Sequence, residues 1–311
     1  MTRVAAIDCG TNTIKLLVAD IDRDAGTQDS LVREMRIVRL GQGVDRTGRL
    51  AEEALARVFA ATDEYADIIA AHGVRAVRFV ATSASRDADN AHVFAEGVRS
   101  RLGVRLEVVS GDEEAQLSYE GATRSLGRGG LVVPFPVAVL DIGGGSTELI
   151  LGSGPGKVSA ARSLDIGSVR LTERLMPSDP PSATEVEAAT RAVDEALDTL
   201  PSYGVRVAEA PTFVGVAGTV TTLGMLLVGL DTWDRDRVHH ASFPLADVHD
   251  LAARLLTMTV AERQRLGVPA GRSDVIGAGA VILDRVLRRS GAEQLLVSDS
   301  DILDGIAWSI A

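Results

Sequence analysis

One pattern occurs twice in this chain, and it constrains the fold more than any other feature. In "AAIDCGTNTIKLLV" an apolar run closes on Asp8 and turns at Gly10, and in "VLDIGGGSTELI" the same happens at Asp141 and Gly143. Each copy is typical of two strands joined by a tight turn. A chain that builds the same hairpin twice is expected to contain two related α/β halves.

The expected order of strands and helices also restarts along the chain. Three strands and then alternating helices and strands are predicted first, and a second series of the same kind begins with the strand that leads to Asp141. Glycines and a proline cluster in "SLGRGGLVVP", residues 125–134, so we expect the boundary there. The predicted domains are therefore 1–125 and 126–299.

Composition excludes several classes of protein. The net charge of −11 argues against bulk nucleic-acid binding, which needs a basic surface. No uncharged apolar stretch reaches the length of about 18 residues that a membrane-spanning helix needs, and no signal peptide is expected. Cys9 is the single cysteine, so a disulfide within one chain is impossible. These features favour a cytoplasmic protein with no membrane or nucleic-acid partner.

The residues at the hairpin tips suggest phosphate chemistry. Glycine and hydroxyl residues at a turn offer backbone N–H groups to an anion without a Cβ in the way. A carboxylate beside the turn would repel phosphate unless a divalent cation lay between them, and Mg²⁺ prefers carboxylates together with phosphate oxygens. We therefore interpret Asp141 and Glu148 as metal ligands beside a phosphate loop. The alternative is a plain hairpin with a flexible turn.

Acidic residues begin the helix expected in "VVSGDEEAQLSYEG". Ser110 and Glu113 have the spacing of a capping box, so Glu113 can have a purely structural role at the start of the helix. One of the acids Asp112, Glu113 and Glu114 could instead orient and deprotonate a water molecule. Arg86, on a polar loop after a strand, is either a solvated side chain or a phosphate clamp.

Several other residues keep open or structural interpretations. "GVAGTVTTLG", residues 215–224, is either a third glycine loop or a helix start capped by Thr219. The histidines show no metal-ligand spacing, and His239 and His240 precede a strand-like stretch in which neighbouring side chains point to opposite faces. Both are interpreted as structural, and Cys9 as a small buried residue.

Six stretches together carry a resemblance to a known family. "DCGTNTIKLLV", "ATSASRDA", "SGDEEAQLSYEGA", "DIGGGSTEL", "GVAGTVTTL" and "VIGAGAVIL" stand in the order found in the exopolyphosphatase/guanosine pentaphosphate phosphatase (Ppx/GppA) family. That family belongs to the actin–sugar kinase–Hsp70 (ASKHA) superfamily. The resemblance implies an α/β fold of two ribonuclease-H-like domains, each a mixed sheet flanked by helices, with an interdomain active-site cleft. It also allows a final helix, about 300–311, to pack back onto the first domain.

The resemblance implies roles for individual residues. The second glutamate of the family's S-G-x-E-E-A motif falls on Glu114, which would activate the attacking water. The acids of the D-x-G-G-G-S-T-E motif fall on Asp141 and Glu148 as metal ligands, with Asp8 as a further candidate at the head of the first loop. The implied phosphate-binding residues are Gly10, Thr11, Asn12, Thr13, Arg86, Gly143, Gly144, Gly145, Ser146 and Thr147.

The implied activity is Mg²⁺-dependent hydrolysis of the terminal phosphate of inorganic polyphosphate, with Mn²⁺ as another possible metal. Alternatives are guanosine pentaphosphate hydrolysis, a kinase of the same superfamily, or a non-enzymatic nucleotide-binding module. A homodimer is also expected. Two departures from the family are visible. The chain stops at Ala311 without the C-terminal helical domains of long exopolyphosphatases, so short polyphosphate chains are expected to be preferred. An arginine common near the start of the family's last helix is absent near Leu303.

Overall fold

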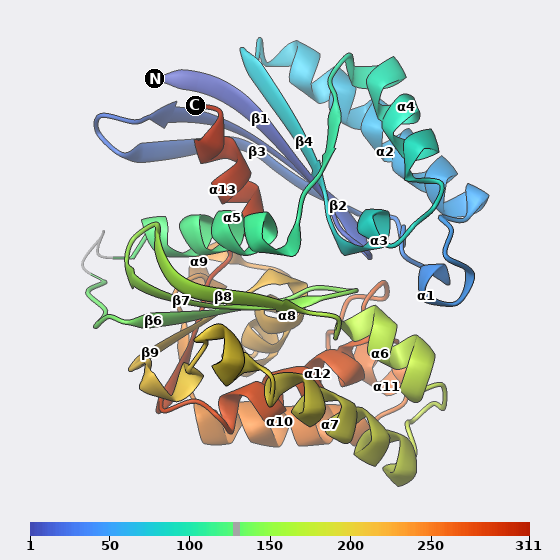
Figure 1. The fold of residues 1–311 in the computed structure, drawn as a ribbon, viewed down its shortest axis with the longest axis vertical. Coiled ribbons are helices and arrows are strands. Elements are labelled where there is room, and N and C mark those ends of the chain that lie inside the picture. Colours follow the sequence, from blue (N-terminus) through green and yellow to red (C-terminus); the bar gives the residue numbers. More distant parts are fainter. Residues whose placement is uncertain (127–130) are drawn as a thin grey trace. The chain divides into compact units, whose positions relative to one another are not determined.

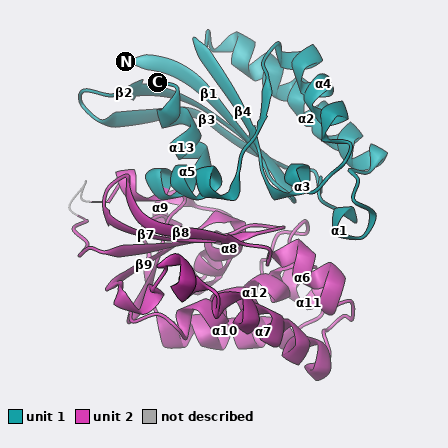
Figure 2. Ribbon diagram, in the orientation of Figure 1, with its two compact units in different colours: residues 1–121, 302–311 teal, residues 122–301 magenta. Residues whose placement is uncertain are grey.

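A computed structural model of the protein describes residues 1–126 and 131–311. These residues form two compact units, which are residues 1–121 with 302–311 and residues 122–301 (Figure 2). Each unit has its own sheet and its own hydrophobic core. No helix of the described residues is long and apolar enough to span a membrane.

The first unit is built on a five-stranded sheet of order β3-β2-β1-β4-β5 (Figure 1). Its strands are β1 (Thr2–Cys9), β2 (Thr13–Asp22), β3 (Thr27–Ile37), β4 (Ala76–Ala81) and β5 (Leu106–Val108). The pairs β1–β2 and β2–β3 are antiparallel, whereas β1–β4 and β4–β5 are parallel. The sheet is therefore mixed, as expected.

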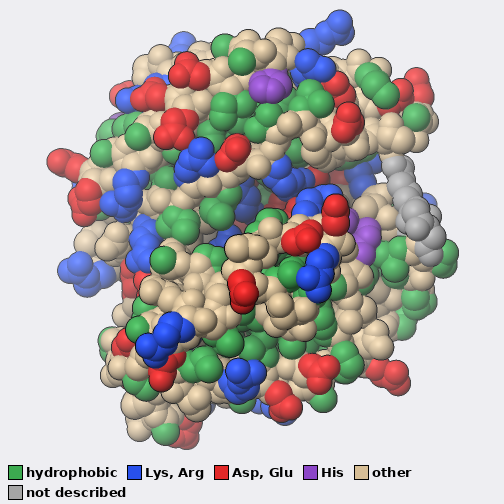
Figure 3. Space-filling model, turned by 180° about the vertical axis from the view of Figure 1, so that it is seen from behind, with side chains coloured by type: hydrophobic (Ala, Val, Ile, Leu, Met, Phe, Trp, Pro, Cys, Tyr) green, Lys and Arg blue, Asp and Glu red, His purple; other side chains and the backbone are tan. Residues whose placement is uncertain are grey.

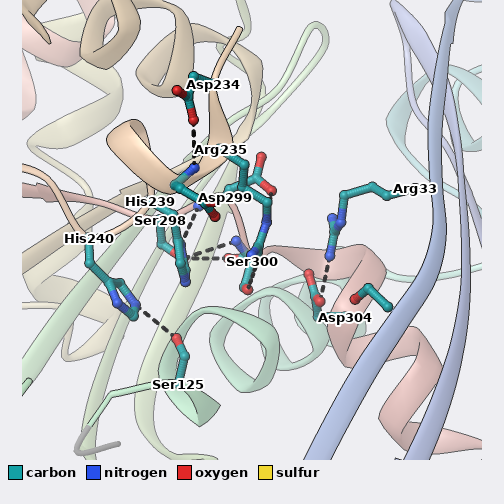
Figure 4. A network of polar contacts seen from close by, with 12 residues as sticks. Arg33, Ser125, Asp234, Arg235, His239, His240, Ser298, Asp299, Ser300 and Asp304 are labelled. Carbon is teal, nitrogen blue, oxygen red and sulfur yellow. Dashed lines mark hydrogen bonds and ion pairs between the residues drawn. The ribbon is translucent and has the colours of Figure 1, made fainter. Parts of the chain in front are cut away.

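Helices cover both faces of this first sheet. They are α1 (Val44–Thr47), α2 (Glu52–Ala71), α3 (Ser83–Arg86), α4 (Ala91–Leu102), α5 (Gly111–Arg124) and α13 (Ile302–Ser309). Because strand side chains alternate between faces, Ile7 joins the core under α2 and α4, and Ala6 joins the core under α13. The carboxylate of Asp304 on α13 accepts a hydrogen bond from Arg33 at 2.6 Å (Figure 4). It accepts another from Gln28 at 2.7 Å. The last helix thus belongs to the first unit.

The second unit repeats this topology. Its strands are β6 (Val137–Ile142), β7 (Thr147–Gly154), β8 (Lys157–Leu164), β9 (Thr212–Val216), β10 (Ser242–Pro244) and β11 (Gln294–Val297). They form a sheet of order β10-β11-β9-β6-β7-β8. Without β10, this is the order of the first sheet, with the same sequence of antiparallel and parallel pairs. The expectation of two mixed sheets flanked by helices is confirmed.

The helices of the second unit pack around one large core. They are α6 (Ser168–Leu175), α7 (Ala183–Leu197), α8 (Ala217–Val228), α9 (Arg235–Val238), α10 (Leu245–Thr257), α11 (Val260–Arg265) and α12 (Ile276–Leu287), with short 3-10 turns at Leu200–Tyr203 and Val207–Glu209. Leu140 of β6 and Leu149 of β7 point into this core. Asp141 and Glu148 are offset from them by one residue, so they lie on the opposite face of the sheet.

Candidate phosphate-binding site

The two hairpin tips have the same internal geometry. In the first, the N–H of Gly10 donates to the carbonyl of Thr13 at 2.9 Å, and in the second the N–H of Gly143 donates to the carbonyl of Ser146 at 3.0 Å. The two bonds join equivalent positions of the repeat. The repeated sequence therefore folds into a repeated turn, as its spacing predicts.

The residues opposite the two aspartates differ in charge. The β1–β2 register places Lys15 opposite Asp8, and their charged atoms lie 3.7 Å apart. The β6–β7 register places Glu148 opposite Asp141. These two carboxylates are buried, at 6% exposed for Asp141 and 1% for Glu148. The first hairpin thus carries an ion pair where the second carries two acids.

This pair of acids suits a divalent cation. Two buried carboxylates on neighbouring strands repel each other when both are ionised, and a cation removes that cost. The hydroxyl of Ser163 donates to Glu148 Oε1 at 2.6 Å, which orients the carboxylate. In the described parts of the chain, no three His, Cys, Asp or Glu side chains gather as a metal-binding set. The ligand roles expected for Asp141 and Glu148 stay predictions. The ligand role expected for Asp8 stays a prediction.

The carbonyl groups of the glycine tip all point toward the beginning of α6. The carbonyl of Gly143 accepts the N–H of Ser168 at 3.0 Å, and that of Gly144 accepts the N–H of Arg170 at 3.1 Å. The carbonyl of Gly145 accepts a hydrogen bond from Nε of Arg170 at 2.7 Å. Three successive carbonyls are therefore engaged on one side.

The amide groups of this tip consequently face the other way. In a planar trans peptide the C=O of one residue and the N–H of the next point in opposite directions. The N–H groups of Gly144, Gly145 and Ser146 therefore point away from α6, and no acceptor for them is found in the parts of the chain that the structure describes. Successive amides directed to one side form a concavity for an anion.

The first hairpin tip is held in a similar way by the segment that follows β3. The carbonyl of Asn12 accepts the N–H of Arg39 at 2.9 Å, and the carbonyl of Thr11 accepts the N–H of Gly41 at 2.8 Å. A Cβ at Gly41 would overlap the Thr11 side chain, so only glycine fits there. Arg39 has a φ of 48°, a strained backbone of the kind that clusters at functional sites.

Glu114 and Arg86 lie together in the first unit. Nη1 of Arg86 donates to Glu114 Oε2 at 2.7 Å and to the carbonyl of Val109 at 3.0 Å. Glu114 is 7% exposed. The sequence predicts both side chains as site residues, but the contact between them depends on how α3 approaches α5. The guanidinium therefore orients the carboxylate.

The capping box expected at the start of α5 is only half formed. The hydroxyl of Ser110 accepts the N–H of Glu113 at 3.2 Å, as expected. The Glu113 carboxylate does not return to Ser110, because it accepts a hydrogen bond from Arg78 at 2.6 Å. Glu113 is therefore a surface ion-pair residue, and the reciprocal half of the prediction is wrong.

Three strand ends of the second unit meet at one edge of its sheet. Strand β9 runs parallel to β6, with Val216 opposite Asp141, and β11 runs parallel to β9, with Val297 opposite Gly215. The carboxyl ends of parallel strands are where ligands bind in open α/β sheets. The glycine tip, the first turn of α8 and the residues after β11 all begin at this edge.

Among the described residues no side chain caps the first turn of α8, whose N-cap is Val216, so the alternative of a cap from Thr219 is wrong. The helix begins instead at Ala217, whose φ is 65°. Nη1 of Arg272 donates to the hydroxyl of Thr222 at 3.2 Å and lies 3.4 Å from the carbonyl of Gly218. Burial lowers the pKa of this guanidinium. Sequence reasoning did not identify Arg272.

The two adjacent histidines form part of a polar network (Figure 4). Their rings stack 3.7 Å apart, and His240 has a φ of 65°, so the expectation of strand residues on opposite faces is wrong. His240 Nε2 lies 3.0 Å from the hydroxyl of Ser125, and the N–H of Asp299 donates to His239 Nδ1 at 3.1 Å. Burial lowers the pKa of His240, and nearby Arg235 lowers it further.

Thr147 and Cys9 are both buried. The Thr147 hydroxyl donates to the carbonyl of Ile166 at 2.5 Å, and the side chain is fully buried. This hydroxyl is therefore engaged within the unit, and the phosphate contact expected for Thr147 stays a prediction. Cys9 is buried, as expected. Burial, with a smaller contribution from Asp8, raises the pKa of the thiol well above its usual value. A thiol in this state is a poor nucleophile.

Comparisons with known proteins identify the family of this chain. The model of the Ppx/GppA phosphatase family matches residues 17–311. Exopolyphosphatase 2 of Mycobacterium tuberculosis is 47% identical over 324 aligned positions, which cover 100% of this chain and 99% of that protein. The crystal structure of an exopolyphosphatase-like protein is 41% identical with a TM-score of 0.95, and covers 100% of this chain and 98% of that one. The Aquifex aeolicus Ppx/GppA structure is 32% identical with a TM-score of 0.83, and covers 99% and 97%. The chain therefore belongs to the Ppx/GppA phosphatase family.

Proposed function

We propose that this protein hydrolyses the terminal phosphate of inorganic polyphosphate. The observation that carries the proposal is the glycine tip, whose amides at Gly144, Gly145 and Ser146 face away from α6 beside the buried acids Asp141 and Glu148. Amides suit phosphate oxygens, and a pair of acids suits a cation that accompanies phosphate. The name of the Mycobacterium tuberculosis relative supports polyphosphate as the substrate.

In the proposed reaction a water oxygen attacks the terminal phosphorus, and the bond from that phosphorus to the bridging oxygen breaks. Glu114 accepts the proton of the water, and Arg86 holds the Glu114 carboxylate in position. The amides of the glycine tip bind the oxygens of the terminal phosphate. Phosphoryl transfer depends mostly on positioning and electrostatic stabilisation, which these groups supply.

Asp141 and Glu148 would hold the divalent cation, which we propose to be Mg²⁺ and which would neutralise phosphate charge when bound. Asp8 differs from these two acids because it lies 3.7 Å from the ammonium group of Lys15. The proposal requires residues of both units to act on one substrate, and the expected cleft between the units stays a prediction. A cytoplasmic homodimer likewise remains a proposal.

Guanosine pentaphosphate is the alternative substrate, because its hydrolysis uses the same chemistry at a terminal phosphate. The matched family is named for both Ppx and GppA phosphatases. The two substrates differ in the guanosine, which a polyphosphate site has no need to contact. A comparison of the two substrates at equal concentration therefore separates the alternatives.

The test is phosphate release from polyphosphates of several lengths, guanosine pentaphosphate and ATP, with wild-type protein and Glu114→Gln. We expect kcat/KM to be highest for polyphosphate and release by the variant to be nearly absent. A higher kcat/KM for guanosine pentaphosphate than for polyphosphate would show that guanosine pentaphosphate is the preferred substrate. Phosphate release by Glu114→Gln at the wild-type rate would show that the activity comes from another site or a contaminant.

A further inference from the structure

The three glycines of the second tip have no side chains that could hold them in place. Three successive glycines have no side chains, and glycine loses more conformational freedom on ordering than any other residue. The equivalent tip of the first unit has its own anchor, because the hydroxyl of Thr11 lies 3.0 Å from that of Ser83 in a buried contact. Beyond the turn bond from Gly143 to Ser146, these three glycines must therefore be held by groups from elsewhere in the unit.

Arg170 supplies two of these external contacts. Its backbone N–H donates to the carbonyl of Gly144 at 3.1 Å, and its Nε donates to the carbonyl of Gly145 at 2.7 Å. Most contacts to the tip come from backbone groups at the start of α6, and the hydroxyl of Ser168 adds one to Gly143 at 3.3 Å. A hydrogen bond from a guanidinium is stronger than one between neutral groups. The Nε contact is the strongest constraint on the middle of the tip.

We propose that Arg170 is a positioning residue, whose Nε–H holds the Gly145 carbonyl so that the N–H of Ser146 faces the phosphate. The two groups belong to one planar peptide, so fixing the carbonyl fixes the direction of the amide. This inference rests on the proposed phosphatase function. Arg170 then acts through the tip and does not itself contact substrate.

The expected kinetic effect follows from this role. An amide that is aimed in advance stabilises charge in the transition state without reorganisation, and losing one such donor lowers kcat by about 10²- to 10³-fold. Loosening the peptide leaves the donor in place but badly aimed. We therefore expect Arg170→Ala to lower kcat by about 10- to 100-fold, less than complete loss of a donor, with a smaller change in KM.

Two substitutions separate the hydrogen bond from the charge. Glutamine carries its amide nitrogen at the same place along the side chain as arginine Nε, without a positive charge. Lysine keeps the charge but places its nitrogen one atom farther out. If Arg170 positions the tip, Arg170→Gln should keep most of the wild-type kcat and Arg170→Lys should fall with Arg170→Ala. Activity retained by lysine and lost by glutamine would overturn the proposal in favour of a direct charge contact.

A matched control and a second readout complete the experiment. Arg191 on α7 forms an exposed pair with Glu187, so Arg191→Gln should leave kcat unchanged. Binding of inorganic phosphate is measured by calorimetry for each variant, and its affinity should fall in the alanine and lysine variants but not in the glutamine variant. Equal phosphate affinity and equal kcat in all Arg170 variants would refute the inference. If the wild type binds phosphate but hydrolyses no polyphosphate, the proposed function fails and the affinities alone decide the role of Arg170.

Discussion

Glu113 and Glu114 are adjacent in sequence but have different surroundings. Glu114 is buried and accepts a hydrogen bond from Arg86, whereas Glu113 is exposed and pairs with Arg78. A carboxylate that orients a water needs a fixed position, which burial and a charged partner provide. These surroundings agree with the role proposed for Glu114, and that role stays a prediction.

Substitution of each glutamate tests this assignment. We expect Glu114→Gln to lower kcat by about 10²- to 10⁴-fold, the usual effect of losing a general base. Glu113→Gln serves as the matched control, because it removes only one surface ion pair, and such pairs contribute about 0–1 kcal/mol to stability. Steady-state kinetics on polyphosphate measure both. Equal losses in the two variants would contradict the distinction between them.

The acids Asp141 and Glu148 give a second prediction at this scale. Asp141→Asn and Glu148→Gln each remove one charge from the buried pair, so each should raise the Mg²⁺ concentration needed for half-maximal activity. Titration of Mg²⁺ at saturating substrate measures this shift, and excess chelator should abolish turnover of the wild type. Full activity in excess chelator would rule out the metal role of the pair.

At the scale of elements, the first residues of α6 determine the shape of the glycine tip. Gly167, just before the helix, packs directly against Gly144 and Gly145, and a Cβ at Gly167 would overlap the Gly144 carbonyl. The close approach allows the amides of α6 to reach the tip carbonyls. Helix and tip therefore form one structural unit, although 25 positions separate Gly145 from Arg170.

We expect Gly167→Ala to push the tip away from α6. Inserting a methyl group into a packed contact costs about 1–3 kcal/mol, and here the group that must move is backbone. Both the free energy of unfolding and kcat should fall, and chemical denaturation with parallel assays measures them. Gly154→Ala is the control, because its Cβ would meet only the flexible end of Lys157. Wild-type kcat in Gly167→Ala would show that the tip tolerates displacement.

The sequence predicts the hairpins well because their signals are local. Asp8 and Asp141 head similar patterns, and counting across the turn places Glu148 opposite Asp141. The same count places Lys15 opposite Asp8, so the ion pair of the first hairpin also follows from a local pattern. The bond from Arg170 to Gly145 could not be predicted, because no local pattern shows which distant segment packs on a turn.

Other errors have equally physical causes. The pattern at Ser110 is compatible with a capping box, but a strong cation on a neighbouring strand, Arg78, draws the Glu113 carboxylate away. The strand-like sequence after His239 and His240 suggests that their side chains point to opposite faces. The backbone of His240 is left-handed, and the two imidazole rings stack against each other. In both cases the surrounding fold, and not the local sequence pattern, determines where the side chain lies.

At the scale of the whole molecule, the two units share one strand order but differ in the chemistry of their hairpins. One pairs an acid with a base, and the other pairs two acids beside three glycines. The chain as a whole carries a net charge of −11, and acidic and basic side chains are interspersed over the face seen in Figure 3. The total charge disfavours long-range attraction of a polyanion.

This charge gives a prediction about long substrates. Repulsion acts over about 10 Å at 0.1 M ionic strength, so phosphates beyond those held by the site should be repelled at low salt. We expect short chains to be preferred and a long chain to be released after each cleavage. Gel analysis at partial digestion should show the whole population shortening gradually. Full-length polymer together with free phosphate and no intermediates would mean that the enzyme is processive.

The central claim is that water, activated in the protein, attacks the terminal phosphorus of polyphosphate. Hydrolysis in ¹⁸O-labelled water, with mass spectrometry of the released phosphate and of the shortened polymer, tests it most directly. The account predicts one solvent oxygen in each released phosphate and none in the polymer, because the bond that breaks joins the terminal phosphorus to the bridging oxygen. Label at the new end of the polymer and unlabelled phosphate would place the attack on the penultimate phosphorus and contradict the account.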